Sequence, residues 1–317
     1  MLEDVQKIAV IGAGIMGHGI AQTIAMAGYS VCLEDLNESI LARAKNNIQY
    51  NLQLLVDNEI IDQNTAIATL PRITMSPDLK IAVSDADIVI EAVSENLSLK
   101  QRLFVEISSY CKEEAILASN TSGLSITQIG KDVKHPQRVV GTHWWNPPYI
   151  IPLVEIIKGE KTSENTLKQT KQFLETVGKE PIFVLKDIPG FIGNRLQFAL
   201  NREAFSLITR GVASAEDVDK AVKASFGFRS PILGPIETMD HAGLDTYAAI
   251  ADYLYKDLDK SDSTFNMVKT LIHDGNLGLK TGKGLYHYDK ARIEEIKKTR
   301  DQNYLKLLKI WQEVRTK

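Results

Sequence analysis

Short apolar runs alternate with longer helical patterns over the first 187 residues of the chain. This alternation predicts stacked βαβ units, and therefore an α/β fold with a mainly parallel sheet. The clearest predicted helices are Ile15–Ala27 and Glu38–Val56. The predicted strands are Lys7–Ile11, Ser30–Leu33, Ile88–Val93, Ala115–Ala118, Val139–Thr142, Leu153–Ile157 and Ile182–Val184.

The pattern changes after Asp187-Ile188-Pro189-Gly190, which is a turn signal. No convincing strand follows, and the periodicity predicts helices instead. These are Phe191–Arg210, ending at Gly211, a helix capped by Ser214, Gly243–Lys256 and Asp262–Asp274. We therefore predict two domains, an α/β domain over residues 1–187 and an all-helical domain over residues 188–317.

The last stretch, Lys290 to Lys317, is locally basic and has an apolar stripe at helical spacing. The stripe consists of Tyr304, Leu307, Leu308, Trp311 and Val314. We interpret the stretch as an extra C-terminal helix that docks on its own chain or on a partner subunit. A helix lying on a membrane surface is the alternative.

Composition and charge exclude several classes of protein. The 317 residues carry 37 Lys+Arg against 40 Asp+Glu, a net charge of −3, whereas a nucleic-acid binder usually needs a basic surplus. The content of 44% hydrophobic and 24% charged residues is typical of a globular protein. The longest uncharged stretch, Val139 to Val154, contains His143, Asn146 and prolines, so we expect no membrane helix.

The chain contains two cysteines, Cys32 and Cys111, which are far apart and have no CxxC or His-rich neighbourhood. We therefore predict neither a disulfide framework nor a metal site. The chain also opens with acidic residues, where a signal peptide would be basic. A reducing cytoplasm is the expected location.

Gly12-Ala13-Gly14-Ile15-Met16-Gly17 follows an apolar strand and opens a helix, which is the setting of a dinucleotide-binding turn. Gly12 allows the tight turn, Gly14 lets the backbone approach a pyrophosphate, and Gly17 lets helix and strand pack closely. Glu34-Asp35 ends the second predicted strand, where a carboxylate binds an adenosine ribose and repels a 2′-phosphate. The sequence thus predicts a Rossmann-type doubly wound sheet that binds NAD rather than NADP.

Among the six histidines, His143 ends an apolar strand and precedes Trp144-Trp145-Asn146-Pro147-Pro148. Ligand sites lie at the carboxyl ends of such strands, and histidine is the common general base for an alcohol proton. Glu155 is the lone charge in the next strand, and a buried carboxylate needs a partner, which makes His143 its natural one. On these residues alone, a core histidine satisfied inside the protein explains the pattern equally well.

Several ordered motifs then resemble the 3-hydroxyacyl-CoA dehydrogenase family over nearly the whole chain. They are Gly12–Gly17, Glu91-Ala92-Val93-Ser94-Glu95-Asn96, Ser119-Asn120-Thr121-Ser122, His143–Pro147, Leu153-Val154-Glu155, Pro189-Gly190-Phe191-Ile192-Gly193-Asn194-Arg195 and Lys280-Thr281-Gly282-Lys283-Gly284. The resemblance implies an NAD-binding domain followed by a helical domain that binds substrate and forms a homodimer.

The resemblance also implies roles for single residues. His143 would be the general base and Glu155 its orienting partner, while Ser122 and Asn194 would donate hydrogen bonds to the reacting oxygen of the substrate. The implied cofactor contacts are Gly12, Gly14, Ile15, Met16, Gly17, Asp35, Glu95, Lys100, Asn146 and Lys280. For Lys100 and Lys280, an ordinary surface charge is the alternative.

Departures from the family pattern bear on the substrate. Relatives that hold coenzyme A use a serine and a lysine on the helix after the second strand, whereas Asn46 to Asn64 contains no Lys or Arg and the aligned positions look like Asn51 and Asn58. The phosphates of coenzyme A favour cationic partners. The Lys280–Tyr288 segment, by contrast, resembles the acyl-CoA branch.

The segments around Asn146 and Gly227-Phe228-Arg229 look more like the gulonate dehydrogenase and λ-crystallin branch, and the carnitine dehydrogenase branch has a similar arginine. Arg229 could therefore bind a free substrate carboxylate through its planar guanidinium. A structural salt bridge within the helical domain is the alternative.

The sequence thus predicts an NAD-dependent oxidoreductase that interconverts an L-3-hydroxy and a 3-oxo group on a short carboxylic acid or its CoA thioester. We favour a free hydroxy acid, with a 3-hydroxyacyl-CoA dehydrogenase of fatty-acid metabolism as the alternative. A non-catalytic NAD-binding protein, like the lens relatives, is a second alternative. A sugar-nucleotide or phosphogluconate dehydrogenase would require a catalytic Cys or Lys motif that we do not find.

Overall fold

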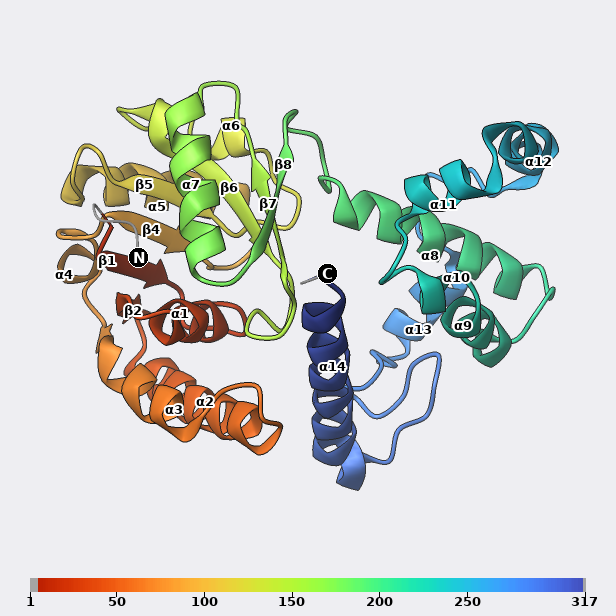
Figure 1. Ribbon diagram of the computed structural model, residues 1–317, viewed down its shortest axis with the longest axis horizontal. Helices are drawn as coiled ribbons and strands as arrows, with labels where there is room; N and C mark the ends of the chain where they lie inside the picture. Colours follow the sequence, from red (N-terminus) through yellow and green to blue (C-terminus); the bar gives the residue numbers. More distant parts are fainter. Residues whose placement is uncertain (1–4, 316–317) are drawn as a thin grey trace. The chain divides into compact units, whose positions relative to one another are not determined.

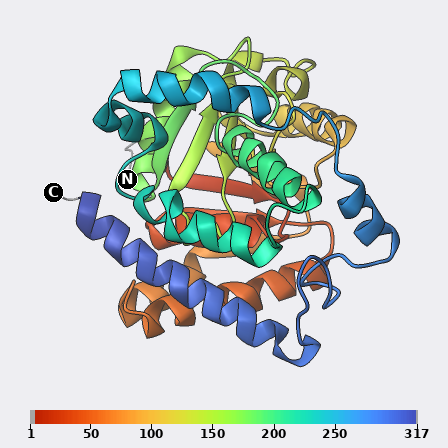
Figure 2. The same cartoon turned by 90° about the vertical axis from the view of Figure 1, so that its right-hand side faces the viewer.

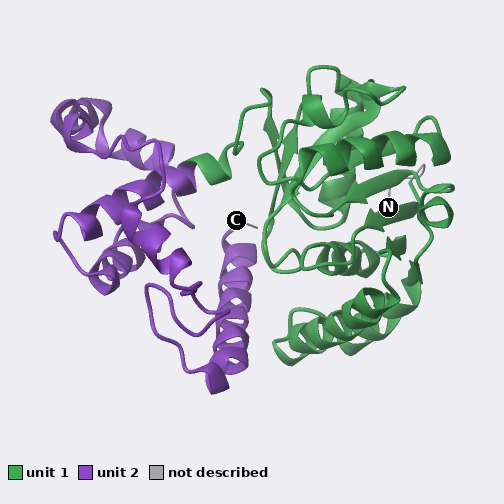
Figure 3. Cartoon of the chain, turned by 180° about the vertical axis from the view of Figure 1, so that it is seen from behind, with its two compact units in different colours: residues 1–195 green, residues 196–317 purple. Residues whose placement is uncertain are grey.

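The computed structural model describes residues 5–315, which form two compact units, Met1–Arg195 and Leu196–Lys317 (Figure 3). The predicted division fell after residue 187, whereas the segment 188–195 groups with the first unit. The backbone N–H groups of Ile192 and Gly193 both donate to the Glu155 carboxylate, which ties this segment to the sheet.

The first unit is built on an eight-stranded sheet with the strand order β3-β2-β1-β4-β5-β6-β7-β8. All neighbouring strands are parallel except β6 and β7, which are antiparallel. The first six strands have the order of a doubly wound dinucleotide-binding sheet, which confirms the predicted fold class. The strands are β1 (Lys7–Ile11), β2 (Ser30–Glu34), β3 (Ile73–Ser76), β4 (Ile88–Glu91), β5 (Ile116–Ser119), β6 (Val139–Trp144), β7 (Leu153–Ile157) and β8 (Glu180–Val184).

Helices cover both faces of this sheet (Figure 1). Successive strand residues point to opposite faces, so Ile8 and Val10 of β1 belong to one core cluster and Ala9 and Ile11 to the other. The first cluster is covered by α1 (Gly17–Met26), α2 (Glu38–Asp57) and α7 (Glu164–Thr176), and the second by α4 (Leu79–Val83), α5 (Leu97–Tyr110) and α6 (Ile126–Ile129). The short helix α3 (Gln63–Thr69) follows α2.

Many of the helices in both units begin with a polar N-cap side chain, of the kind predicted for Ser214. Each accepts a hydrogen bond from a backbone N–H of the first turn, which satisfies one of the donors left open there. These N-cap residues are Asn37, Asp62, Asp78, Asn96, Ser125, Ser163 and Ser214.

The second unit contains the rest of α8 (Gly193–Thr209) and the helices α9 to α14. They are α9 (Ala215–Ala224), α10 (Phe226–Arg229), α11 (Pro235–Ala242), α12 (Leu244–Asp257), α13 (Asn266–His273) and α14 (Ile293–Arg315). Within the described residues this unit has no strand beyond the isolated bridges of Lys283, in agreement with the predicted helical domain. Figure 2 shows α14 as a long, uninterrupted helix.

The second unit buries few apolar side chains. Val218, Ala251 and Leu305 are buried, whereas Phe198, Phe228 and many others on its helices are exposed. Among residues 5–315, no helix is long and apolar enough to span a membrane.

Candidate functional site

Of the three glycines in the turn between β1 and α1, Gly12 and Gly17 have no room for a side chain, whereas Gly14 faces open space. A Cβ on Gly12, whose φ is +95°, would lie 2.9 Å from the Ala92 carbonyl oxygen, and one on Gly17 would lie 1.7 Å from the Gly12 oxygen. A Cβ on Gly14 would meet no atom within 4 Å. The backbone at Gly14 is therefore open beside the N-terminus of α1, where a pyrophosphate binds in this type of fold.

Acidic groups gather at the end of β2. Asp35 accepts a hydrogen bond from the Ala13 N–H at 3.0 Å, which joins it to the glycine-rich turn. Burial, with smaller contributions from Asp35, Glu106 and Asp78, raises the pKa of Glu34 to about 7. This acidic end suits a ribose and disfavours a 2′-phosphate, so the residues present fit NAD. The other two predicted cofactor contacts of the glycine-rich turn are both accessible, since Ile15 is 73% exposed and Met16 is half-buried.

Lys100 is fully buried, so it is not the ordinary surface charge that we considered. Its ammonium lies 2.5 Å from Glu91 and 3.5 Å from Glu95. Glu91 also accepts hydrogen bonds from the Ser119 hydroxyl and the Val93 N–H. We did not predict this ion pair, although Glu91 is a lone charge in an apolar strand, the same signal that marked Glu155.

The ion pair supports the loop after β5. The Glu95 carboxylate accepts hydrogen bonds from the Thr121 hydroxyl at 2.5 Å and from the Ser122 N–H at 2.9 Å. The Asn194 amide in turn donates to the Ser122 carbonyl at 2.9 Å. Ser122 and Asn194, which come from distant parts of the chain, are thereby brought together.

His143 and Glu155 face each other across the antiparallel strands β6 and β7. The His143 Nδ1 lies 2.7 Å from one Glu155 oxygen, and the other oxygen accepts the N–H groups of Ile192 and Gly193 at 2.9 and 3.0 Å. Burial alone would raise the pKa of Glu155, but these hydrogen bonds outweigh it and lower the pKa below its usual value.

An ionised Glu155 favours the tautomer of His143 that carries its proton on Nδ1. The Nε2 atom then holds a lone pair, and it has no partner among residues 5–315. The imidazole is therefore arranged to accept a proton at Nε2.

Lys179, which we did not single out from the sequence, fixes the loop between these two strands. Its buried ammonium donates to the carbonyls of Pro148 at 2.5 Å and Ile151 at 2.9 Å, and it lies 5.5 Å from the centre of the Trp144 ring. Pro148 packs on the dinucleotide helix, since a Cβ on Gly19 would lie 2.8 Å from its ring. The exposed Asn146 is carried by the same loop.

Asn51 and Asn58 are already used by the fold. The Asn51 amide donates to the Gln22 side chain at 3.0 Å, and both residues are buried. The Asn58 amide donates to the Leu54 carbonyl at 2.8 Å. Asn51 is therefore inaccessible to a coenzyme A contact, whereas Asn58 uses one of its two amide N–H groups within the fold.

Arg229 and Lys280 lie in the second unit and are exposed. Within the described part of the chain, the Arg229 side chain forms no ion pair, so the structural salt bridge that we considered has no partner there. Lys280 lies in a turn before Lys283.

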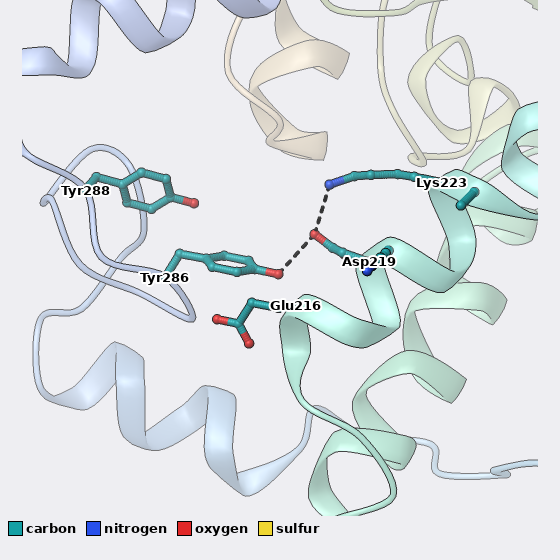
Figure 4. A pocket seen from close by; sticks show the side chains of 7 residues that line it. Glu216, Asp219, Lys223, Tyr286 and Tyr288 are labelled. Atoms are coloured by element: carbon teal, nitrogen blue, oxygen red, sulfur yellow. Dashed lines mark hydrogen bonds and ion pairs between the residues drawn. The ribbon is translucent and has the colours of Figure 1, made fainter.

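A cavity of about 560 Å³ occurs in the second unit, between α9 and the segment around Tyr286 (Figure 4). Tyr286 and Lys223 both point at the Asp219 carboxylate, at 3.0 and 3.4 Å. None of the predicted site residues lines it. Over residues 5–315, no group of three metal-ligating side chains comes together.

Comparison with known proteins gives two family models that match along the chain. The model described as 3-hydroxyacyl-CoA dehydrogenase, NAD binding domain, matches residues 7–188, and the model for the C-terminal domain of the same enzyme matches residues 190–288. The helix α14 lies beyond the second match.

Two curated relatives differ in their substrates. The 5-formyl-3-hydroxy-2-methylpyridine 4-carboxylate 5-dehydrogenase of Mesorhizobium japonicum is 34% identical over 306 residues, which cover 96% of this chain and 98% of the relative. The mitochondrial hydroxyacyl-coenzyme A dehydrogenase of Rattus norvegicus is 38% identical over 292 residues, or 90% and 91% of the two chains. One similar crystal structure is that of 5-formyl-3-hydroxy-2-methylpyridine 4-carboxylic acid 5-dehydrogenase, described as an NAD+-dependent dismutase. It superimposes with a TM-score of 0.91 at 34% identity, and the match covers 97% of this chain and 99% of that one.

Proposed function

The chain belongs to the 3-hydroxyacyl-CoA dehydrogenase family of NAD-dependent oxidoreductases, and from this premise we propose that it interconverts a hydroxy and an oxo group on a short free carboxylic acid. His143 is the general base in this proposal. The observation that carries it is the 2.7 Å hydrogen bond from Nδ1 to Glu155, which leaves Nε2 as the proton acceptor.

In the oxidation, His143 Nε2 takes the proton of the substrate hydroxyl. NAD, when bound, supplies the carbon that accepts the hydride. Glu155 stabilises the imidazolium that results, because it stays ionised and keeps its bond to Nδ1. An asparagine amide has two N–H donors, and Asn194 uses one on the Ser122 carbonyl, so the other is available for the substrate oxygen. Ser122 offers its exposed hydroxyl beside it.

The remaining predicted cofactor contacts are part of the same proposal. Gly12, Gly14 and Gly17 shape the pyrophosphate site, and Asp35 binds the adenosine ribose. Glu95 and Asn146 line the same carboxyl edge of the sheet, and Lys100 acts through Glu95. Lys280 stays a prediction.

Three observations favour a free acid over a thioester. The segment from Asn46 to Asn64 contains no cation, and Asn51 is buried against Gln22. The relative from Mesorhizobium japonicum, whose name gives a pyridine carboxylate as substrate, aligns over 98% of its length. Arg229 is an exposed arginine without an ion pair in the described residues, and we propose that it binds the carboxylate.

A 3-hydroxyacyl-CoA dehydrogenase of fatty-acid metabolism is the second candidate. It is favoured by the rat relative, which is 38% identical and is named for acyl-coenzyme A. A non-catalytic NAD-binding protein is disfavoured, because such a protein would not need the buried bond between His143 and Glu155.

A substrate panel tests the proposal. We would measure kcat/KM with NAD for 3-hydroxybutyrate, gulonate and carnitine beside 3-hydroxybutyryl-CoA. The proposal expects the highest kcat/KM among the free acids and a raised KM for that acid in the Arg229→Leu variant. A higher kcat/KM for the thioester would overturn the free-acid proposal, and an unchanged KM would remove Arg229 from it.

We also propose a homodimer formed through the helical unit. Phe198 and Ile236 are 67% and 73% exposed, and large apolar side chains left exposed on several helices of one unit support an interface there. A cytoplasmic location remains part of the proposal, supported by the unpaired thiols of Cys32 and Cys111.

A further inference from the structure

Two consecutive tryptophans follow His143, and they have different environments. Trp144 is 2% exposed and belongs to the core cluster on the α1 side of the sheet. Trp145 is half-exposed, and its ring centre lies 5.2 Å from that of His143. Trp145 is the first residue beyond β6, and the ring separation places its indole beside the imidazole, while Trp144 packs in the core.

A second aromatic ring lies beside the imidazole, but it is not accessible. The Phe191 ring centre lies 5.7 Å from that of His143, and Phe191 is 1% exposed. Of the two aromatic neighbours of His143, Trp145 is therefore the one that can contact a ligand.

The absence of a side chain at Gly193 makes room for the indole. A Cβ at this position would lie 2.4 Å from Cζ2 of Trp145, so any other residue would displace the ring. Gly193 also donates its N–H to Glu155 and precedes Asn194, which binds the Ser122 carbonyl. Trp145 thus lies next to His143 and Gly193, close to the groups that the proposed function uses.

We propose that Trp145 is a specificity-determining residue, whose indole stacks on an aromatic ring bonded to the reacting carbon of the substrate. This inference rests on the proposed function and names its substrate class: free acids with a flat ring, rather than an aliphatic chain, at that carbon. In the oxidation the C–H hydride passes to NAD and the hydroxyl proton to His143, so the products are an aryl ketone, NADH and a protonated imidazole.

The test compares two unreactive acids, cinnamate and crotonate, which differ by a phenyl ring in place of a methyl group. Their dissociation constants with the NAD-loaded protein are measured by calorimetry. Stacking contributes about 0.5–1.5 kcal/mol beyond the burial of area, so Trp145→Leu should weaken cinnamate binding by about 2- to 10-fold more than crotonate binding.

Gly193→Ala provides a second variant that keeps the indole but displaces it. It should also weaken cinnamate more than crotonate, and the double variant should lose no more than Trp145→Leu alone, because both changes act through one contact. Trp311→Phe, on α14, is the matched control and should leave both constants unchanged.

Equal losses for the two acids, or a loss of NAD affinity in place of cinnamate affinity, would overturn the inference. Turnover of 3-hydroxy-3-phenylpropanoate against 3-hydroxybutyrate completes the experiment, and the inference expects the phenyl compound to lose more kcat/KM in Trp145→Leu. If 3-hydroxybutyryl-CoA outperforms every free acid in the unmodified protein, the proposed function fails, whereas the calorimetric comparison still decides the role of Trp145.

Discussion

The two units of this protein differ in how many of their apolar side chains they bury. In the first unit apolar clusters cover both faces of the sheet, and the buried charges of Lys100 and Glu155 have partners. In the helical unit Phe198, Phe228 and Ile236 are exposed, while few apolar residues are buried. The first unit holds the proposed proton acceptor in a covered interior, whereas the exposed apolar side chains of the second are the surface on which the proposed dimer rests.

The largest expected effect is a loss of stability when a buried ion pair of the first unit is broken. Lys100→Met leaves the Glu91 carboxylate buried without its cation, and breaking such a pair costs about 3–5 kcal/mol. Urea unfolding measures the loss. Adding Glu91→Gln should restore much of it, because the buried charge is removed. A loss no larger than that of the exposed control Lys45→Met would contradict this account.

The next effect concerns the helical unit. Phe198→Glu and Ile236→Glu should each weaken the proposed dimer by about 10- to 100-fold, since burying such a side chain contributes about 1.5–3 kcal/mol. Sedimentation velocity measures the dissociation. The matched control is Ile67→Glu, which changes a 64% exposed residue of the first unit and should leave the dissociation of the dimer unchanged. If the unmodified protein sediments as a monomer, the dimer proposal is wrong.

The smallest effect, taken per pH unit, is a pH dependence of stability. Burial lowers the pKa of Lys179 from its ordinary value of 10.5 to about 7. Between these two pH values the unfolded chain binds more protons than the folded one, so the free energy of unfolding should rise with pH, by at most about 1.4 kcal/mol per pH unit. Lys179→Met should remove this rise, and a slope that survives in the variant would refute the assignment.

Much of the fold could be predicted because its strands are continuous apolar runs. The predicted strand Leu153–Ile157 coincides with β7. The edge strand Ile73–Ser76 was missed, because its four residues mix polar and apolar side chains and lack an apolar run. Edge strands carry this weaker pattern since only part of their surface is covered.

The candidate site was predictable where a polar residue interrupts an apolar strand. His143 and Glu155 were paired on that ground, and the strand register places them opposite each other. Lys100 and Lys179 were not recognised as buried, because a lysine in a helix or after a turn looks like a surface residue until the tertiary contacts are known. Their partners are set by packing between elements, which local pattern does not encode.

The central claim is that His143 is the proton acceptor of an NAD-dependent dehydrogenase. The most direct measurement is kcat of His143→Ala on the best substrate of the panel, together with the dissociation constant of NADH from fluorescence titration. The account predicts that kcat falls by about 100- to 10,000-fold while NADH binds as before. Retained turnover, or a loss of NADH affinity that accounts for the loss of activity, would contradict it.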